Sequence, residues 1–176
     1  LALGEGSGTE AVLSAGEALV SSGAAPDALV IALGRRLRAA GELGRALSIL
    51  GQSRHPEAIA ELGETARRAG SLAMAERCST QVEQDSDPRV RVRALATLAR
   101  MALDRGDAAR ALECLASAPS AAATLEVRAL AELRLGQGGN ALRTAQQGRA
   151  VASTDEERAR LDATLGLIYH REGDAE

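Results

Sequence analysis

The chain has 176 residues and a formal net charge of −3 at pH 7, and all 21 of its basic residues are arginine. An acidic balance argues against nucleic acid and against an acidic membrane surface as partners, because both require clustered positive charge. No apolar run reaches the roughly 18 to 20 residues that span a bilayer. We therefore expect no membrane insertion and a cytoplasmic location, with the periplasm as the alternative.

The residue types indicate an all-helical protein. Alanine, leucine, arginine and glutamate, which favour helices, are abundant, and Tyr169 is the single aromatic residue. A core without phenylalanine or tryptophan must be filled by alanine and aliphatic side chains, and such small side chains allow helices to approach closely.

In chain order, the apolar pattern and the positions of glycine and proline predict ten helices. They are expected near residues 10–21, 27–40, 44–52, 56–69, 73–84, 89–105, 108–118, 122–135, 139–152 and 156–172. Connectors are expected at 21–27, 52–57, 84–88 and 117–122, where turn-forming residues gather. Asp107 and Ser71 each follow a turn glycine and are expected to cap the helix that comes next, and Asp87 is expected near the start of the helix at 89–105.

One pattern recurs along these helices: an apolar helix, a glycine, and an alanine five residues after the glycine. The glycines are Gly6, Gly41, Gly70, Gly106, Gly136 and Gly173, with a mean spacing of 33.4 residues. The alanines are Ala11, Ala46, Ala75, Ala111 and Ala141. We expect the glycines to end helices in the left-handed conformation that glycine adopts at low strain. A period of this length is typical of stacked helix pairs.

The repeated unit resembles the tetratricopeptide repeat, a helix–turn–helix unit of 34 residues. The final unit matches the family pattern best, with Leu165, Gly166, Tyr169 and Gly173 at family positions. The resemblance implies an all-α, right-handed α-solenoid of antiparallel helix pairs with about 33–34 residues per repeat. Small residues at one position of the first helix should let the second helix approach closely; they are Gly34, Gly63, Ala99 and Gly166.

The repeats divide the chain into a series of units. We expect a partial repeat at 1–26, repeats at 27–55, 56–91, 92–121 and 122–158, and a first helix alone at 159–176. The chain is then a segment of a larger, bacterial protein. In the last unit, Leu165, Ile168 and Tyr169 are expected to carry apolar surface, through which a second chain would make contact.

The resemblance also implies a concave groove lined by the first helix of each pair. Mapping the family's groove positions onto this sequence selects Arg35, Arg38, Glu64, Arg67, Arg68, Arg93, Arg100, Arg134, Thr164, His170 and Arg171. Arginine suits paired hydrogen bonding to carboxylates, so an acidic peptide segment or another protein is the expected partner. The alternative is an ordinary solvated face with glutamate–arginine pairs within each helix.

We therefore expect a protein-interaction scaffold and no enzyme, since no nucleophile, base or cofactor motif stands out. The alternative function is a regulatory or substrate-sensing arm of a multidomain enzyme (a kinase, protease or ATPase) whose catalytic domain lies outside this chain. RNA binding by a related helical repeat is disfavoured by the acidic balance. The lysine and asparagine clamp by which some family members hold a C-terminal carboxylate is excluded, because lysine is absent and Asn140 is the single asparagine.

Other candidate sites have simpler explanations. Cys78 and Cys114 are expected to be free thiols that serve as small packing residues, with no disulfide and no metal. The glycine-rich segment 4–8 lacks the lysine of a phosphate-binding loop. The acidic segment 84–88 is expected to be a connector, and His170 is expected on a helix surface.

Overall fold

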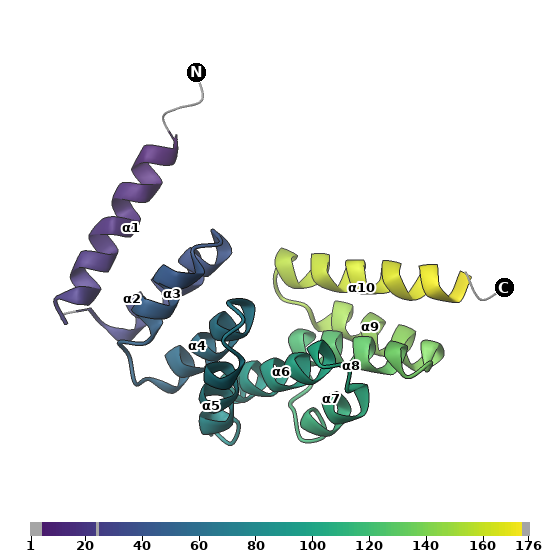
Figure 1. Ribbon diagram of the computed structural model, residues 1–176. Helices are drawn as coiled ribbons and strands as arrows, with labels where there is room; N and C mark the ends of the chain where they lie inside the picture. The colour runs from purple at the N-terminus through teal and green to yellow at the C-terminus, as the bar shows by residue number, and fades with distance from the viewer. Residues whose placement is uncertain (1–4, 24, 174–176) are drawn as a thin grey trace. The chain divides into compact units, whose positions relative to one another are not determined.

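The computed structural model describes the backbone of residues 5–23 and 25–173, and the side chains within these ranges other than those of residues 5–9, 12 and 172. Every regular element in these ranges is an α-helix (Figure 1), which confirms the all-helical prediction. None of the described helices is both long enough and apolar enough to cross a membrane.

The ten helices lie close to their predicted positions. They are α1 (Glu5–Ser21), α2 (Asp27–Ala39), α3 (Leu43–Leu50), α4 (Pro56–Arg68), α5 (Leu72–Val82), α6 (Pro88–Asp104), α7 (Ala108–Cys114), α8 (Ala122–Arg134), α9 (Gly138–Val151) and α10 (Asp155–Gly173). The prediction that α7 extends to residue 118 is wrong. Its backbone changes to tighter hydrogen bonds, such as the one from the Ala116 N–H to the Glu113 carbonyl, before Pro119.

The expected turn at Gly6 is also wrong, because α1 already begins at Glu5 and includes this glycine. Gly6 lies in the first helical turn, where glycine and other poor helix formers are tolerated. The expected turn at Gly173 is wrong in the same way, because Gly173 is the last helical residue of α10 and does not lie in a turn after it.

The four internal turn glycines confirm the predicted pattern. Gly41, Gly70, Gly106 and Gly136 have φ angles of 83°, 77°, 81° and 74°. All four lie in the left-handed region, where a side chain would be strained. The same backbone conformation therefore ends α2, α4, α6 and α8.

The chain divides into two compact units, residues 1–78 and residues 79–176, and the boundary falls within α5. In the first unit α2 packs against α3 and α4, and α1 packs against α2 and α3. The core of this unit joins α1, α2 and α3 through Leu13, Val20, Val30, Leu33, Leu37, Ala46 and Ile49. Its members are aliphatic, as the composition predicts.

In the second unit the first helices contact their neighbours in order: α6 contacts α8, and α8 contacts α10. The second helix α7 packs against α6 and α8, and the second helix α9 packs against α8 and α10. One core cluster surrounds Leu115 and Val127, and another joins α8, α9 and α10 around Ile168. Each helix therefore contacts its near neighbours in sequence.

The close approach expected at the small first-helix residues holds for Gly34, whereas no second helix follows Gly166 among the described residues to test it there. A Cβ atom at Gly34 would lie 2.5 Å from the Leu50 side chain, so α3 crosses α2 where no larger residue fits. Around Gly166, a Cβ atom would meet nothing within 4 Å. In α10, the expected exposure of Tyr169 is confirmed, but Ile168 is fully buried because it faces α8 and α9.

Side chains cap several helices at their first turns. Asp107 accepts a hydrogen bond from the Arg110 N–H, as predicted, and Asp87, which was expected only near the start of α6, accepts one from the Arg89 N–H. His55 caps α4 through its Nδ1 atom, which accepts from the Glu57 N–H at 3.2 Å. This role of His55 was not predicted, because histidine is uncommon among capping residues.

Candidate functional site

The eleven predicted groove residues all lie on first helices of the predicted pairs. Arg35 and Arg38 are on α2; Glu64, Arg67 and Arg68 are on α4; Arg93 and Arg100 are on α6; Arg134 is on α8; and Thr164, His170 and Arg171 are on α10. They are described below within each compact unit.

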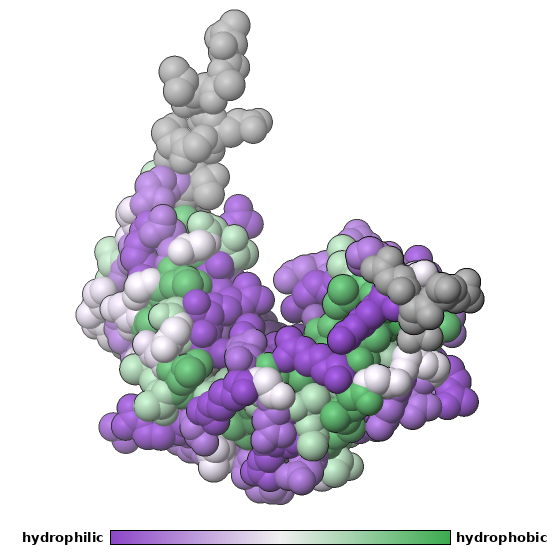
Figure 2. Space-filling model, turned by 45° about the vertical axis from the view of Figure 1, so that its right-hand side comes forward, coloured by the Kyte–Doolittle hydropathy of each residue, from purple (hydrophilic) through white to green (hydrophobic). Residues whose placement is uncertain are grey.

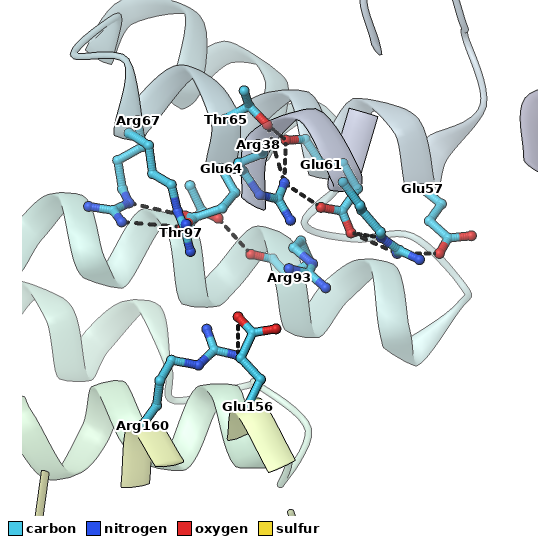
Figure 3. Close-up of polar contacts among 12 residues, drawn as sticks. Arg38, Glu57, Glu61, Glu64, Thr65, Arg67, Arg93, Thr97, Glu156 and Arg160 are labelled. Carbon is cyan, nitrogen blue, oxygen red and sulfur yellow. Dashed lines mark hydrogen bonds and ion pairs between the residues drawn. The ribbon is translucent and has the colours of Figure 1, made fainter. Parts of the chain in front are cut away.

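In the first unit, two arginines of α2 converge on one glutamate of α4. Glu61 accepts hydrogen bonds from Arg35 Nε at 2.7 Å and from an Arg38 terminal nitrogen at 2.6 Å. The same Arg38 nitrogen lies 3.2 Å from the Thr65 hydroxyl, and Arg35 also binds Glu57 at 2.6 Å. Figure 3 shows Arg38 pointing toward Glu61 and Thr65. These five side chains join α2 to α4.

Burial strengthens the attraction between the charges of this cluster, because little water is present to screen them. The Glu61 side chain is 0% exposed and the Arg38 side chain 10% exposed, whereas Arg35 is 42% exposed. Burial alone would lower the pKa of Arg35, but Glu61 and Glu57 outweigh it and hold that pKa above its ordinary value. Arg35 therefore keeps its charge. One edge of its guanidinium binds the buried Glu61 carboxylate, and the rest of the side chain is in contact with solvent.

A second cluster lies within α4. Glu64 is buried and accepts hydrogen bonds from Arg67 Nε at 3.0 Å and from Arg68 Nε at 2.9 Å. Arg68 is 39% exposed, whereas Arg67 is largely buried. This arrangement corresponds to the alternative of pairs within one helix, while the Arg35 and Arg38 pairs connect different helices.

In the second unit, Arg100 of α6 binds Glu126 of α8 at 2.9 Å, and both side chains are largely buried. Arg134 of α8 donates to the Leu103 carbonyl at the end of α6. The carbonyl of Arg93 accepts from the Thr97 hydroxyl at 2.9 Å, a pair that Figure 3 also draws. The first helices α6 and α8 are therefore linked by two arginines.

The three candidates on α10 differ in exposure. Thr164 is buried and its hydroxyl donates to the Arg160 carbonyl at 3.0 Å, within the helix. His170 and Arg171 are exposed in the last turns of α10. Thr164 thus presents little polar surface, whereas the other two reach solvent.

Sequence reasoning missed the carboxylates that hold the arginines: Glu57, Glu61 and Glu126. A usable signal was present, because Arg35 and Glu61 are 26 residues apart and so are Arg100 and Glu126. Arg35 and Arg100 also both stand six residues before a turn glycine. A search for charged pairs recurring at one separation would have found both contacts.

The cysteines and acidic residues form no metal site in the part of the chain that the structure describes. Cys78 and Cys114 are free and partly buried. Burial raises the pKa of both thiols, although Arg77 and Arg110 act in the opposite direction. The thiols are therefore protonated at neutral pH and poor nucleophiles.

No protein-family model matches the chain, and no curated protein matches it. The resemblance to tetratricopeptide repeats therefore depends on the residues and their spacing.

Proposed function

We propose that the chain is a helical-repeat scaffold, a right-handed α-solenoid of the tetratricopeptide type, that binds a partner protein across its first helices. Three features support this architecture. The left-handed glycines recur. The first helices α2, α6 and α8 pack on the second helices α3, α7 and α9, and within each unit first helices contact one another, α2 with α4, α6 with α8 and α8 with α10. Stacked repeats gain stability in this way, from interfaces between neighbours.

The observation that carries the proposal is the repeated arginine–glutamate contact between successive first helices. Arg35 with Glu61, and Arg100 with Glu126, are each 26 residues apart, and each arginine stands six residues before a turn glycine. Of these side chains, Arg35 is 42% exposed, so it reaches the surface that α2 and α4 share. In a solenoid, this surface is the extended face that receives a ligand.

The partner chemistry follows from the exposed arginines on that surface. Arg35 and Arg68 are each held at one edge by a buried carboxylate and are about two-fifths exposed. A guanidinium carries five N–H donors, so a fixed and exposed arginine has donors for a further carboxylate. For Arg68 this would be a second carboxylate, and for Arg35, which already binds Glu61 and Glu57, a third. An acidic segment of a partner protein is therefore the proposed ligand.

Affinity capture with the intact protein tests this proposal. Three baits are compared: wild type, the first-helix variant Arg35→Gln with Arg68→Gln, and the control variant Arg110→Gln with Arg149→Gln. The control arginines are exposed, ion-paired residues of α7 and α9. Each variant removes two charges, and circular dichroism verifies that each is folded.

We expect acidic partners that bind wild type and the control to be lost from the first-helix variant. Fluorescence anisotropy with a labelled peptide from the captured partner should then show at least fivefold weaker binding to that variant alone. Equal capture by all three baits, or equal loss from both variants, would contradict the proposed binding surface.

A further inference from the structure

The guanidinium of Arg35 is shared between two carboxylates that differ in how firmly they are held. Arg35 Nε and Nη2 each lie 2.7 Å from Glu61 Oε1, and Nη2 also donates to Glu57 Oε1 at 2.6 Å. The Glu61 side chain is fully buried and binds Arg38 at 2.6 Å as well. Figure 3 shows Glu61 beside Arg38, with Glu57 apart from that pair. Glu61 is therefore fixed in the interior of the first unit.

The carboxylate of Glu57 is held much less firmly. Its side chain is 36% exposed, and in the described part of the chain Arg35 is the only hydrogen-bond or ion-pair partner of its carboxylate. The backbone of Glu57, in contrast, is fixed in the first turn of α4, where its N–H donates to His55 Nδ1 at 3.2 Å. The Glu57 carboxylate can therefore leave Arg35 by rotation of its own side chain, without a change in the fold.

The donors of Arg35 decide how a ligand carboxylate can bind there. A guanidinium binds a carboxylate most strongly through two parallel N–H groups, and it offers one such pair at Nε and Nη2 and another at its two terminal nitrogens. Glu61 occupies the first pair. Glu57 occupies Nη2, which also belongs to the second pair. A ligand carboxylate therefore reaches a complete pair of donors on Arg35 only when Glu57 has moved away.

We propose that Glu57 is an internal competitor for the acidic ligand: the ligand's carboxylate displaces Glu57 from Arg35, while Glu61 stays bound. This inference rests on the proposed function, because it concerns the binding of the same acidic segment to the same arginine. The displaced contact is an exposed ion pair, and such pairs contribute little stability. Glu57 therefore weakens the binding of acidic ligands by a small factor and covers the donors of Arg35 when no ligand is bound.

Fluorescence anisotropy with a labelled oligoglutamate peptide tests this competition. The titrations are made at low ionic strength, because hydrophilic side chains cover much of the face drawn in Figure 2 and salt screens charges in solvent. Wild type is compared with Glu57→Ala, with Arg35→Gln and with the variant that carries both substitutions. The control is Glu113→Ala, which removes an exposed, ion-paired glutamate of α7. Circular dichroism verifies that each variant is folded.

The Glu57→Ala variant should bind the peptide roughly twofold to fivefold more tightly than wild type, the factor to which an exposed ion pair corresponds. The Arg35→Gln variant should bind the peptide more weakly. In the Arg35→Gln background, Glu57→Ala should not tighten binding, because no contact is left for Glu57 to compete for. The Glu113→Ala variant should bind as wild type does, which separates the loss of this contact from the loss of one negative charge.

Different outcomes contradict the proposed function and the competition by Glu57. If the peptide does not bind wild type, or binds Arg35→Gln equally well, the proposed function is overturned and this inference with it. If Arg35→Gln weakens binding but Glu57→Ala leaves it unchanged or weakens it, the inference alone is overturned. Equal tightening by Glu57→Ala with and without Arg35→Gln would also overturn the inference alone, since such tightening comes from charge and not from competition.

Discussion

At the scale of single residues, the most constrained charge described in the chain is that of Glu61. Its side chain is fully buried and is held by Arg35 and by the nearly buried Arg38. A buried ion pair adds little net stability compared with an apolar pair, but removing one partner leaves the other charge buried without compensation. Glu61 should therefore be far less tolerant of substitution than a surface glutamate.

Replacing Glu61 with alanine is expected to lower the free energy of unfolding by about 3 kcal/mol, because Arg38 loses its carboxylate partner. Urea unfolding followed by circular dichroism measures the change. Glu57→Ala is the matched control, since Glu57 also binds Arg35 but is 36% exposed, and it should cost less than about 1 kcal/mol. Equal losses for the two variants would refute the importance of burial here.

Glu157 is expected to make stability depend on pH. Burial would raise its pKa, but hydrogen bonds from Ser153 and from the Thr154 N–H outweigh burial and lower it. A carboxyl whose pKa is lower in the folded state stabilises the fold above its unfolded pKa, about 4.3. This stabilisation is lost as the pH falls through the lowered folded value.

The Glu157→Gln variant should be less stable than wild type at pH 7 by about 0.5–1 kcal/mol, and the difference should shrink as the pH is lowered to 3. Urea unfolding at the two pH values measures this convergence. Glu156→Gln serves as control, because Glu156 is largely exposed and makes one distant contact with Arg160. A Glu157→Gln deficit that persists unchanged at pH 3 would rule out titration of Glu157 as its cause.

At the scale of helices and turns, the local signals in the sequence predicted most of the boundaries. Proline and the capping aspartate at 87–88 set the start of α6, and the left-handed glycines set the ends of four first helices. These signals act over a few residues, so they are readable without tertiary structure. The start of α1 was mispredicted because a glycine in a first helical turn and a glycine in a loop look alike in sequence.

Substitution of two glycines that are three residues apart, Gly136 and Gly139, distinguishes the effect of backbone strain on stability from the effect of helix propensity. Gly136→Ala forces alanine to φ near 74° and is expected to lower the free energy of unfolding by about 1 kcal/mol. Gly139→Ala lies within α9, with open space around it, and should be neutral or stabilising by up to about 1 kcal/mol. In thermal unfolding, we expect Gly136→Ala to lower the stability and Gly139→Ala not to lower it. Similar effects of the two substitutions would argue against the left-handed turn.

The close contact of α2 with α3 has its own test. Gly34→Ala places a Cβ atom 2.5 Å from Leu50, so the helices must separate, at an expected cost of about 1–3 kcal/mol. Gly166→Ala occupies the equivalent position on α10 and should not destabilise the protein, because that face is open. If both substitutions prove harmless in urea unfolding, the tight α2–α3 approach is not maintained in solution.

At the scale of the whole molecule, the sequence pattern predicted the helical class and the period, but it did not predict how the candidate surface is neutralised. The alternative of pairs within one helix covers Arg67 with Glu64. Arg38 and Arg100, in contrast, are each held by a glutamate of a neighbouring helix of the same unit, Glu61 and Glu126. Such pairing depends on the rotation of each helix about its axis, which side-chain spacing alone leaves open. Ile168 was misplaced for the same reason: its side of α10 turns toward α8 and α9.

The central claim is that the first helices form the partner-binding surface, and site-specific photo-crosslinking in the intact protein tests it most directly. A photoreactive residue at Ala39, an exposed position one turn after Arg35 on α2, leaves the proposed binding arginines intact and should crosslink the partner, whereas the same residue at Arg110 on α7 should not. Crosslinking of the partner from position 110 with none from position 39 would contradict the account.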